Sequence, residues 1–372
     1  MKKIAVIGAN SPLIPFYRHA KRLGYIIIGI AWEEGAVCKQ YCDRFYPISF
    51  TDIDRVLEIC QLEKIDGITS FSLESALPTV VYVAQKMGLI SNSVECLQLT
   101  QNKYAQRQAL ERAGIRVPAY YLIEKESDLV KVKCKFPVIV KPVDSGGSQG
   151  ISEVENSVAL SDAFHLALNY SKTKKVIIEE FIDGREFSVE YISFKGKHYF
   201  LQVTDKVTSG SPRFVEMQHH QPADISSAIK EKIKTMVEAN LTALKIENSA
   251  SHTEIKLNSQ NELYIIETGA RMGGDFISSD LVRLSTGYDF VEGSLKLAVN
   301  EFEEPHFSHP YYSGVYFYSR LAPHVLDVIK AHKQWPEIVE WEVSENELPE
   351  VRSNADRGGY FLYQRKNGRF NI

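Results

Sequence analysis

Strand and helix patterns alternate regularly over residues 1–95, and this alternation limits the folds that the chain can adopt. Short apolar runs typical of buried strands are each followed by a helical pattern. The strands are expected at 4–9, 25–32 and 65–71, and the helices at 15–23, 52–63 and 75–87. Strands that alternate with helices of this length predict a parallel sheet covered on both faces. The first strand ends in Gly8, but Asn10 and Leu13 occupy the next two glycine positions of the dinucleotide-binding fingerprint, which is therefore excluded.

The rest of the chain mixes strands and helices. One helix is expected over residues 99–114, and antiparallel strands with one or two helices over about 120–200. Residues 306–372 are rich in aromatic side chains and end in a short basic tail, which indicates a small β-rich appendage. We therefore predict an α/β protein whose domains cover residues 1–95, 96–305 and 306–372.

The composition narrows the range of partners. The chain has 372 residues and a net charge of -4, so no basic excess is present to neutralise a nucleic-acid backbone. Its longest apolar run, residues 25–32, is far below the ~20 residues that span a bilayer. The five cysteines form no C-x-x-C pair, which favours reduced thiols. We expect a cytoplasmic protein that acts on small molecules, with no nucleic-acid or membrane partner. The sequence leaves open whether the protein forms a homodimer.

A glycine-rich turn between two predicted strands is the first candidate for chemistry. Residues 138–151 read VIVKPVDSGGSQGI, so that Lys141 precedes a loop containing Gly146, Gly147 and Gly150. Glycines allow the backbone N–H groups to approach an anion, and Lys141 adds a mobile positive charge. The segment lacks the G-K-[ST] sequence and the following helix of a P-loop. A hairpin turn beside a surface lysine is the alternative interpretation.

A second segment, residues 175–194, places three carboxylates on neighbouring strands. Glu179 and Glu180 follow a buried apolar run directly, and Glu186 comes after the break at Gly184. Carboxylates in this arrangement suit a ligand rich in hydroxyl and amine groups. Solvated charge at strand ends is the alternative.

The third segment, residues 251–275, is predicted to be a hairpin that ends in a glycine-rich turn. A two-residue loop at Ser259 and Gln260 would put His252 opposite Glu267, with Glu254 diagonal to Glu267 on the same face. Two carboxylates at that separation can both bind one cation, and oxygen ligands favour Mg²⁺ over zinc. An exposed acidic pair is the alternative, and a bulge would change this register.

An arginine and two glycines follow the hairpin directly. Arg271 and the backbone amides of Gly273 and Gly274 suit an anion such as a carboxylate or an acyl phosphate. A structural arginine in a strand-to-helix turn is the alternative interpretation.

Three further residues are candidates for the substrate pocket. Glu74 ends the FSLE stretch that follows the third predicted strand, beyond the carboxyl end where ligands of parallel sheets bind, although an acid at a helix start would look the same. Glu216 and His219 lie in the segment FVEMQHHQP and could line a pocket or act as a general base.

Taken together, these segments resemble the ATP-grasp superfamily in their usual order. The resemblance covers about residues 1–305 and implies a Rossmann-like parallel-sheet domain followed by an ATP-grasp domain, with a lid over about 120–190. It implies that two antiparallel sheets hold ATP between them, with Mg²⁺ or Mn²⁺ bound by Glu254 and Glu267. The implied ATP-binding residues are Lys103, Lys141, Ser145, Gly146, Gly147, Ser148, Gly150, Glu179, Glu180, Phe181, Ile182 and Glu186.

The form E-x-G-A-R-x-G-G-D at 267–275 resembles the L-amino-acid ligase branch of this superfamily. Many members carry an asparagine two residues after the second metal-binding glutamate, whereas this chain has Gly269. The resemblance implies an ATP-dependent carboxylate–amine ligase that forms ADP through an acyl phosphate. Lys141 and Arg271 would then be catalytic, and Glu74, Glu216, His219, Arg271, Gly273 and Gly274 would bind the substrates. A carboxyphosphate-forming carboxylase and a non-catalytic ATP-binding sensor remain the alternatives.

Overall fold

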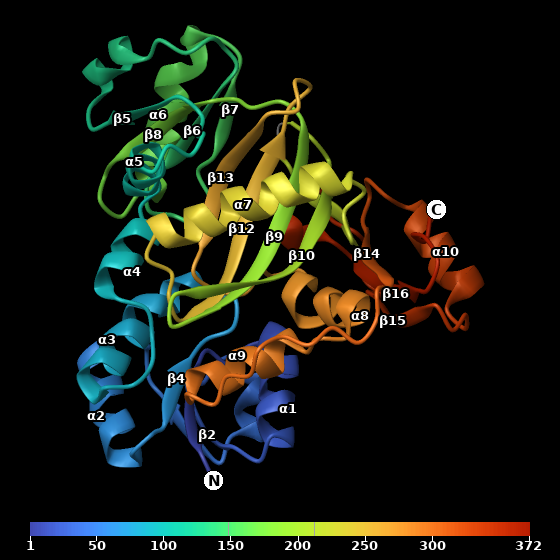
Figure 1. Cartoon of the computed structure of the whole chain (residues 1–372). Coiled ribbons are helices and arrows are strands. Elements are labelled where there is room, and N and C mark those ends of the chain that lie inside the picture. Colours follow the sequence, from blue (N-terminus) through green and yellow to red (C-terminus); the bar gives the residue numbers. More distant parts are fainter. Residues whose placement is uncertain (148, 212) are drawn as a thin grey trace.

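Three sheets organise the chain, and a computed structural model describes residues 1–147, 149–211 and 213–372 of it. The sheets contain four, eight and four strands. In Figure 1 the N-terminal sheet lies at one end of the molecule, the eight-stranded sheet in the middle, and the smaller antiparallel sheet at the other end.

The N-terminal sheet is parallel, with the strand order β3-β2-β1-β4. Its elements are β1 (Lys3–Ile7), α1 (Ile14–Arg22), β2 (Ile26–Ala31), β3 (Arg44–Pro47), α2 (Ile53–Glu63), β4 (Gly67–Thr69) and α3 (Leu77–Met87). Helices α2 and α3 cover one face, while α1 and α9 (Phe290–Ala298) cover the other. The predicted parallel sheet covered on both faces is confirmed, but sequence analysis missed β3 and the contribution of α9. Gly67 permits this close packing, because a Cβ there would lie 2.2 Å from the carbonyl oxygen of Ala298.

The helix expected over 99–114 is in fact two helices. Helix α4 (Val94–Thr100) ends before Asn102, and α5 (Lys103–Arg112) begins after it. The Asn102 side chain accepts a hydrogen bond from the Ala105 amide at 3.0 Å, which is the usual role of an asparagine N-cap. This break puts Lys103 in the first turn of α5.

The small sheet is antiparallel and has the strand order β5-β8-β6-β7. It falls within about residues 120–190, the segment expected to be a lid, and we term it the lid. Its elements are β5 (Tyr120–Ile123), β6 (Val138–Pro142), β7 (Ser152–Val154), α6 (Leu160–Tyr170) and β8 (Val176–Glu180). The glycine-rich turn joins β6 to β7. Helix α6 buries Phe164 and Ala167 against the sheet.

The eight-stranded sheet has the order β13-β12-β9-β10-β11-β14-β16-β15. Its elements are β9 (Arg185–Phe194), β10 (Lys197–Thr208), β11 (Glu216–Gln221), α7 (Ser227–Ala243), β12 (Ser249–Leu257), β13 (Leu263–Gly269), a π-helical turn (Ile277–Leu281), α8 (Val282–Thr286), β14 (Tyr312–Tyr318), α10 (His324–His332), β15 (Ile338–Val343) and β16 (Gly359–Arg365). The C-terminal region is rich in strands, as expected. Its three strands extend the central sheet through the pairing of β11 with β14, so they do not form a sheet of their own.

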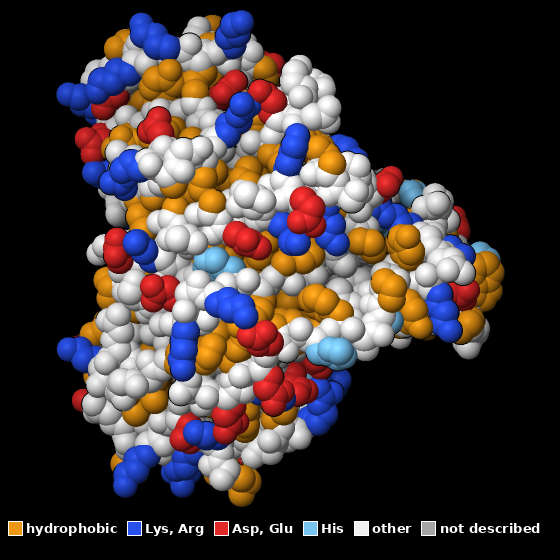
Figure 2. Space-filling model, in the orientation of Figure 1, with side chains coloured by type: hydrophobic (Ala, Val, Ile, Leu, Met, Phe, Trp, Pro, Cys, Tyr) orange, Lys and Arg blue, Asp and Glu red, His pale blue; other side chains and the backbone are white. Residues whose placement is uncertain are grey.

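The surface matches the nearly balanced charge of the sequence. On the face shown in Figure 2, Lys and Arg side chains are interspersed with Asp and Glu side chains. Within the described residues, none of the helices has the length and apolar character that a membrane crossing requires.

Candidate functional site

One face of the eight-stranded sheet is polar, and the opposite face packs on α7. Along β9, β10 and β12, alternate residues carry polar or charged side chains, and the intervening positions are mostly apolar. The register brings the polar positions together, because Glu186 pairs with both Lys206 and Lys256, and Glu190 pairs with His252. The polar positions are Glu186, Ser188, Glu190, Gln202, Thr204, Lys206, His252, Glu254 and Lys256.

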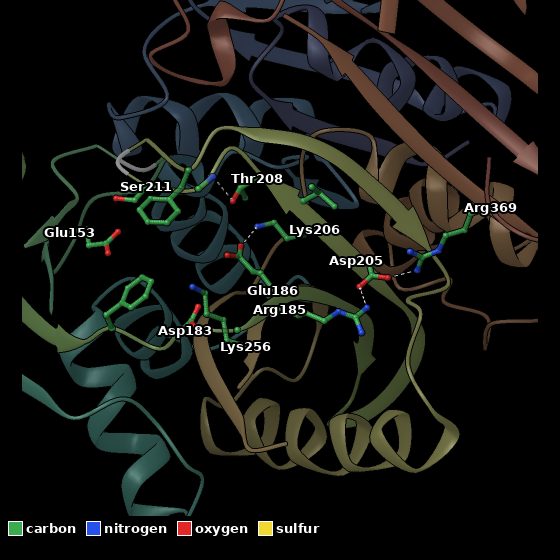
Figure 3. Close-up of a pocket in the computed structure, with 15 residues that line it drawn as sticks. Glu153, Asp183, Arg185, Glu186, Asp205, Lys206, Thr208, Ser211, Lys256 and Arg369 are labelled. Atoms are coloured by element: carbon green, nitrogen blue, oxygen red, sulfur yellow. Dashed lines mark hydrogen bonds and ion pairs between the residues drawn. The ribbon is translucent and has the colours of Figure 1, made fainter. Parts of the chain in front are cut away.

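A cavity of about 490 Å³ opens between the lid and one end of this polar face. Figure 3 shows Glu153 of the lid on one side, and Glu186, Lys206 and Lys256 of the large sheet on the other. Phe181 also lines the cavity, and the Lys256 ammonium lies 4.8 Å from the centre of its ring. The cavity therefore has an aromatic wall and charged groups of both signs.

Residues 179–182, which the resemblance implies to bind ATP, face different directions. Phe181 lines the cavity, and the buried Ile182 accepts a hydrogen bond from Lys256 Nζ at its carbonyl oxygen, 3.0 Å away. Glu180 is exposed and accepts from the Ala119 amide at 3.3 Å. Glu179 is 3% exposed and points toward cations of the lid and of α5.

Three neighbouring charged side chains form what we term the Lys141 cluster: Lys141, Glu179 and Arg107. The Glu179 carboxylate lies 2.7 Å from Lys141 Nζ and 2.6 Å from Arg107 Nε. Burial alone would raise the pKa of Glu179, but the two cations lower it to about 2. Burial also lowers the pKa of Lys141, and the nearby Arg107 adds to that effect against the attraction of Glu179. The cluster thus carries one more positive than negative charge.

Lys103 connects this cluster to the metal-binding hairpin and to the glycine loop. Its Nζ lies 2.9 Å from Glu267 Oε1 and donates to the Ser145 carbonyl oxygen at 2.8 Å. Burial opposes the charge of Lys103, but Glu267 outweighs it and raises the pKa of the ammonium. Within the same loop, a Cβ on Gly146 would lie 3.5 Å from Glu74 Oε2, so the loop lies against the N-terminal domain. Ser148 of this loop lies outside the described residues, while Gly147 and Gly150 have the positive φ values of 67° and 71°.

On the large sheet, Lys206 is surrounded by carboxylates, and we term this group the Lys206 cluster: Lys206, Glu186, Glu216 and Glu254. Lys206 Nζ lies 2.6 Å from Glu254, 2.9 Å from Glu186 and 3.0 Å from Glu216. Burial would lower the pKa of Lys206, but the three carboxylates hold it well above its ordinary value. The cluster therefore carries an excess of negative charge.

The hairpin register differs from the one predicted. Leu257 pairs with Leu263, so the turn is one residue longer than the predicted two-residue loop, and a β-bulge after Glu254 shifts the pairing by one more residue. As a result, Glu254 pairs directly with Glu267, and His252 pairs with Gly269. The predicted pairing of His252 with Glu267, and the diagonal position of Glu254, are therefore wrong. The two carboxylates still share one face, and directly opposed residues are closer than diagonal ones.

The donor set of Glu254 and Glu267 fits a magnesium ion. It consists of carboxylate oxygens only, which are the ligands that Mg²⁺ prefers. Burial would raise the pKa of each carboxyl, but Lys206 outweighs it at Glu254 and Lys103 at Glu267, so both pKa values are lowered and both groups are anionic. At Gly269, a Cβ would lie 3.3 Å from the Arg271 side chain, so glycine lets Arg271 pack against this strand.

His252 and Glu190 support the turn after β13. His252 Nδ1 lies 2.6 Å from Glu190 Oε1, and Ser278 Oγ donates to the other oxygen at 3.0 Å. Burial opposes the charge on His252, yet Glu190 raises its pKa to about 9. The Gly273 amide, expected to face a substrate, already donates to Ser278 Oγ at 2.7 Å, because the turn folds back on itself here.

Arg271 lies between this turn and the N-terminal domain. Its Nη1 donates to the Met272 carbonyl oxygen at 3.0 Å, and its Nη2 lies 3.7 Å from Glu74 Oε2. Its Nε is buried and has no hydrogen-bond partner among the described residues. The guanidinium therefore retains a donor for an anion, and Gly274 beside it has open space at its Cα. Burial, followed by Glu267, raises the pKa of Glu74.

Sequence analysis did not single out several residues of this site. The main ones are Arg107, Glu190, Lys206, Asp275, Asn354 and Arg357. A usable signal existed for Lys206, since Gln202, Thr204 and Lys206 put polar groups at alternate positions of a strand that also contains Leu201 and Val203.

Comparison with known proteins identifies the fold. Residues 134–280 match the ATP-grasp domain family. The solved structure of the L-amino acid ligase from Bacillus licheniformis is similar, with a TM-score of 0.81 and 23% identity, covering 99% of this chain and 94% of that one. The chain therefore has the ATP-grasp fold, and residues 134–280 form an ATP-grasp domain. The resemblance predicted from the sequence is confirmed.

Two curated relatives have names that indicate different substrates. Formate-dependent phosphoribosylglycinamide formyltransferase of Hydrogenovibrio crunogenus is 28% identical over 237 residues, which cover 62% of this chain and 60% of that protein. Alanine–anticapsin ligase of Bacillus subtilis is 23% identical over 246 residues, which cover 60% of this chain and 52% of that protein. The chain thus spans only about half to three fifths of the length of these relatives.

Proposed function

We propose that this protein is an ATP-dependent carboxylate–amine ligase that joins an amino acid to an amine or to a second amino acid. The observation that carries the proposal is the separation of charge in the cleft. The Lys141 cluster and Lys103 provide cations beside the glycine loop, and carboxylates predominate on the facing strands. Phosphoryl transfer requires that arrangement, since catalysis relies on positioning and on charge neutralisation.

In the first step, a carboxylate oxygen of the substrate attacks the γ-phosphorus of ATP, the bond to the β,γ-bridging oxygen breaks, and ADP leaves. Lys103, Lys141 and the amides of the glycine loop neutralise the phosphates, and the unpartnered Nε of Arg271 orients the carboxylate. Glu254 and Glu267 would hold Mg²⁺, which supplies further positive charge next to the phosphates. The lid, lying against Glu74, excludes water from the acyl phosphate.

In the second step, an amine nitrogen attacks the acyl carbon, phosphate leaves, and the nitrogen releases a proton. His219 lies on the same face of the site and is the proposed group for receiving the amine. The similarity to amino-acid ligases supports an amino-acid substrate. We also propose that the protein works in the cytoplasm, where its five unpaired cysteines stay reduced.

The test is a product analysis with ATP, Mg²⁺ and a panel of amino acids, in which hydroxylamine replaces the natural amine. We expect ADP by chromatography and the hydroxamate of the accepted amino acid. AMP with pyrophosphate would contradict the phosphoryl-transfer step. ADP release stimulated by bicarbonate alone would support a carboxylase, and ATP binding without any stimulated turnover would support a sensor.

A further inference from the structure

The C-terminal region reaches into the cleft through the loop before β16. Asn354 Nδ2 donates to Glu216 Oε2 at 3.3 Å and to Asp275 Oδ2 at 3.2 Å, so one amide bridges two carboxylates. The Asn354 side-chain oxygen accepts from the Glu216 amide at 3.0 Å. Arg357 Nη2 lies 2.5 Å from Asp275 Oδ1. Two side chains of one short loop therefore fix the positions of both acids.

The backbone around Asp275 depends on the same region. Asp275 and Phe276 are consecutive non-glycine residues with positive φ values of 48° and 66°. The Phe276 ring lies 4.3 Å from that of Tyr360 on β16, and the Arg357 guanidinium lies 3.8 Å from the ring of Phe317 on β14. Packing against the C-terminal strands thus maintains a backbone conformation that aims Asp275 toward Glu216.

The nearby cations do not fully balance the negative charge of Glu216 and Asp275. One oxygen of Glu216, one of Asp275 and one ring nitrogen of His219 lie within 4.8 Å of one another. Arg357 pairs with Asp275, but Lys206 divides its charge among Glu216 and two other carboxylates. Burial, followed by Glu216, raises the pKa of Asp275, which indicates an incompletely neutralised pair.

We infer that Asp275 is a specificity-determining residue which, together with Glu216, binds the ammonium group of an amino-acid substrate, and that Asn354 and Arg357 are positioning residues for it. An ammonium has three donors and no acceptor, so acceptors less than 4.8 Å apart can all lie within hydrogen-bond distance of one nitrogen. Lys206 contacts both Glu216 and Glu254, so the ammonium would lie one side chain away from the metal-binding pair. The inference rests on the proposed ligase function and assigns the C-terminal loop a part in selecting the substrate.

The experiment compares amino acids with 2-hydroxy acids that have the same side chain, such as alanine with lactate and phenylalanine with phenyllactate. ADP release is measured with hydroxylamine as the acceptor. Wild-type protein should prefer the amino acid by about 100-fold or more in kcat/KM, since charge-assisted hydrogen bonds of this kind are strong. Asp275→Asn should raise the KM for the amino acid by about 10-fold or more, and leave the hydroxy-acid values and the KM for ATP unchanged.

Variants of the loop separate positioning from general stability. Arg357→Met should shift discrimination in the same direction as Asp275→Asn, and Arg357→Lys should restore part of it. Arg352→Gln is the matched control, because Arg352 lies in the same loop, is exposed, and pairs with Glu350 at 2.7 Å. If Asp275→Asn does not fold, Asp275→Glu provides the comparison, since it keeps the charge and moves it by one methylene.

The possible outcomes distinguish a failure of the proposed function from a failure of the ammonium assignment. If no carboxylic acid stimulates ADP release by wild-type protein, the proposed function itself fails. If wild type prefers amino acids and Asp275→Asn discriminates equally well, the inference fails and the function stands. If Asp275→Asn changes the Mg²⁺ dependence of turnover while the amino-acid KM is unchanged, then Glu216, His219 and Asp275 form a metal site, and the ammonium assignment is overturned.

Discussion

Lys141 and Lys206 are both buried, but their surroundings are opposite. Lys141 shares the single carboxylate of Glu179 with Arg107, and its pKa is lowered by burial and by that neighbouring cation. Lys206 is surrounded by Glu186, Glu216 and Glu254, and its pKa is raised well above the ordinary value. One side of the cleft has spare positive charge, and the other has spare negative charge.

This difference indicates which ligands each side can accept. Burying an ion pair seldom stabilises a protein, because desolvation offsets the Coulomb attraction. Clusters with an excess of one sign are still less favourable unless a ligand neutralises them. The Lys141 side therefore suits phosphate groups, and the Lys206 side suits a metal ion and an ammonium group. Changing the charge of either side should therefore change the turnover or the stability of the protein measurably.

The largest effect is expected at the metal-binding pair on the negative side. Glu267→Gln keeps the shape of the side chain and removes one charge, so turnover should fall by at least ~100-fold, because electrostatic clamps of this kind contribute several kcal/mol. ADP release measured against Mg²⁺ concentration tests this. Glu262→Gln, at the exposed turn of the same hairpin, is the control and should keep normal turnover. Near-normal activity of Glu267→Gln at low millimolar Mg²⁺ would reject the metal assignment.

A second effect is expected on the positive side, where the Lys141 cluster should make the stability of the protein depend on pH. The pKa of Glu179 is about 2 in the folded protein, below its ordinary 4.5, because Arg107 and Lys141 outweigh the effect of burial. A lowered folded pKa stabilises the protein above the ordinary value, and this stability is lost as the pH falls from about 4.5 to about 2. The full difference corresponds to about 3 kcal/mol. Urea unfolding at several pH values should show Glu179→Gln destabilised at pH 7 and nearly equal to wild type near pH 2.

The control for this prediction is the adjacent residue. Glu180→Gln changes an exposed carboxylate on the same strand, and its stability should follow that of wild type throughout. A constant difference between Glu179→Gln and wild type at all pH values would show that the cations do not lower this pKa.

These charged clusters also show where sequence analysis reached its limit. The paired glutamates and Arg271 are close together in sequence, so spacing suggested their grouping, whereas the distant glycine loop was joined to them only by the resemblance to ATP-grasp proteins. Arg107 and Glu179 are in contact although they are 72 positions apart in the sequence, and Asn354 and Glu216 are 138 positions apart. No local sequence pattern therefore connects the members of either pair. The β-bulge after Glu254 shifted the hairpin register in a way that side-chain alternation does not reveal.

The fold was predicted more completely than the site for a related reason. Apolar periodicity determined the parallel sheet of residues 1–95, because each strand and helix carries its own pattern. The joining of β14 to β11 depends on contacts between segments that are far apart in the sequence, such as the pairing of Gln218 with Tyr316, which periodicity does not encode. The break between α4 and α5 had a local signal, the N-cap Asn102, that lies within an otherwise helical pattern.

A third prediction compares the two lysines directly. Lys206→Met leaves three carboxylates without their shared cation, and should destabilise the protein by about 2 kcal/mol, a value reduced because these side chains are 18–28% exposed. Lys141→Met leaves Glu179 paired with Arg107, so its cost should be below about 1 kcal/mol. Urea unfolding at pH 7 measures both. Equal losses of stability in the two variants would show that the imbalance of charge between the two sides does not affect the stability of the folded protein.

The smallest effect concerns the glycine loop, which lies where the two sides meet. Ser145 accepts a hydrogen bond from Lys103, and Gly146 lies beside Glu74, so the loop touches a cation on one side and a carboxylate on the other. The phosphates of ATP would give the amides of Gly146 and Gly147 acceptors, and these amides should exchange about 10-fold more slowly with nucleotide bound. Hydrogen exchange with and without ATP and Mg²⁺ measures the change. The amide of Gly196, in the β9–β10 turn, donates to the Glu247 carbonyl oxygen at 3.1 Å and should be unaffected. Equal exchange of the loop in both conditions would mean that it is a hairpin turn that does not close on phosphate, and that the positive side binds its anion through Lys103 and Lys141 alone.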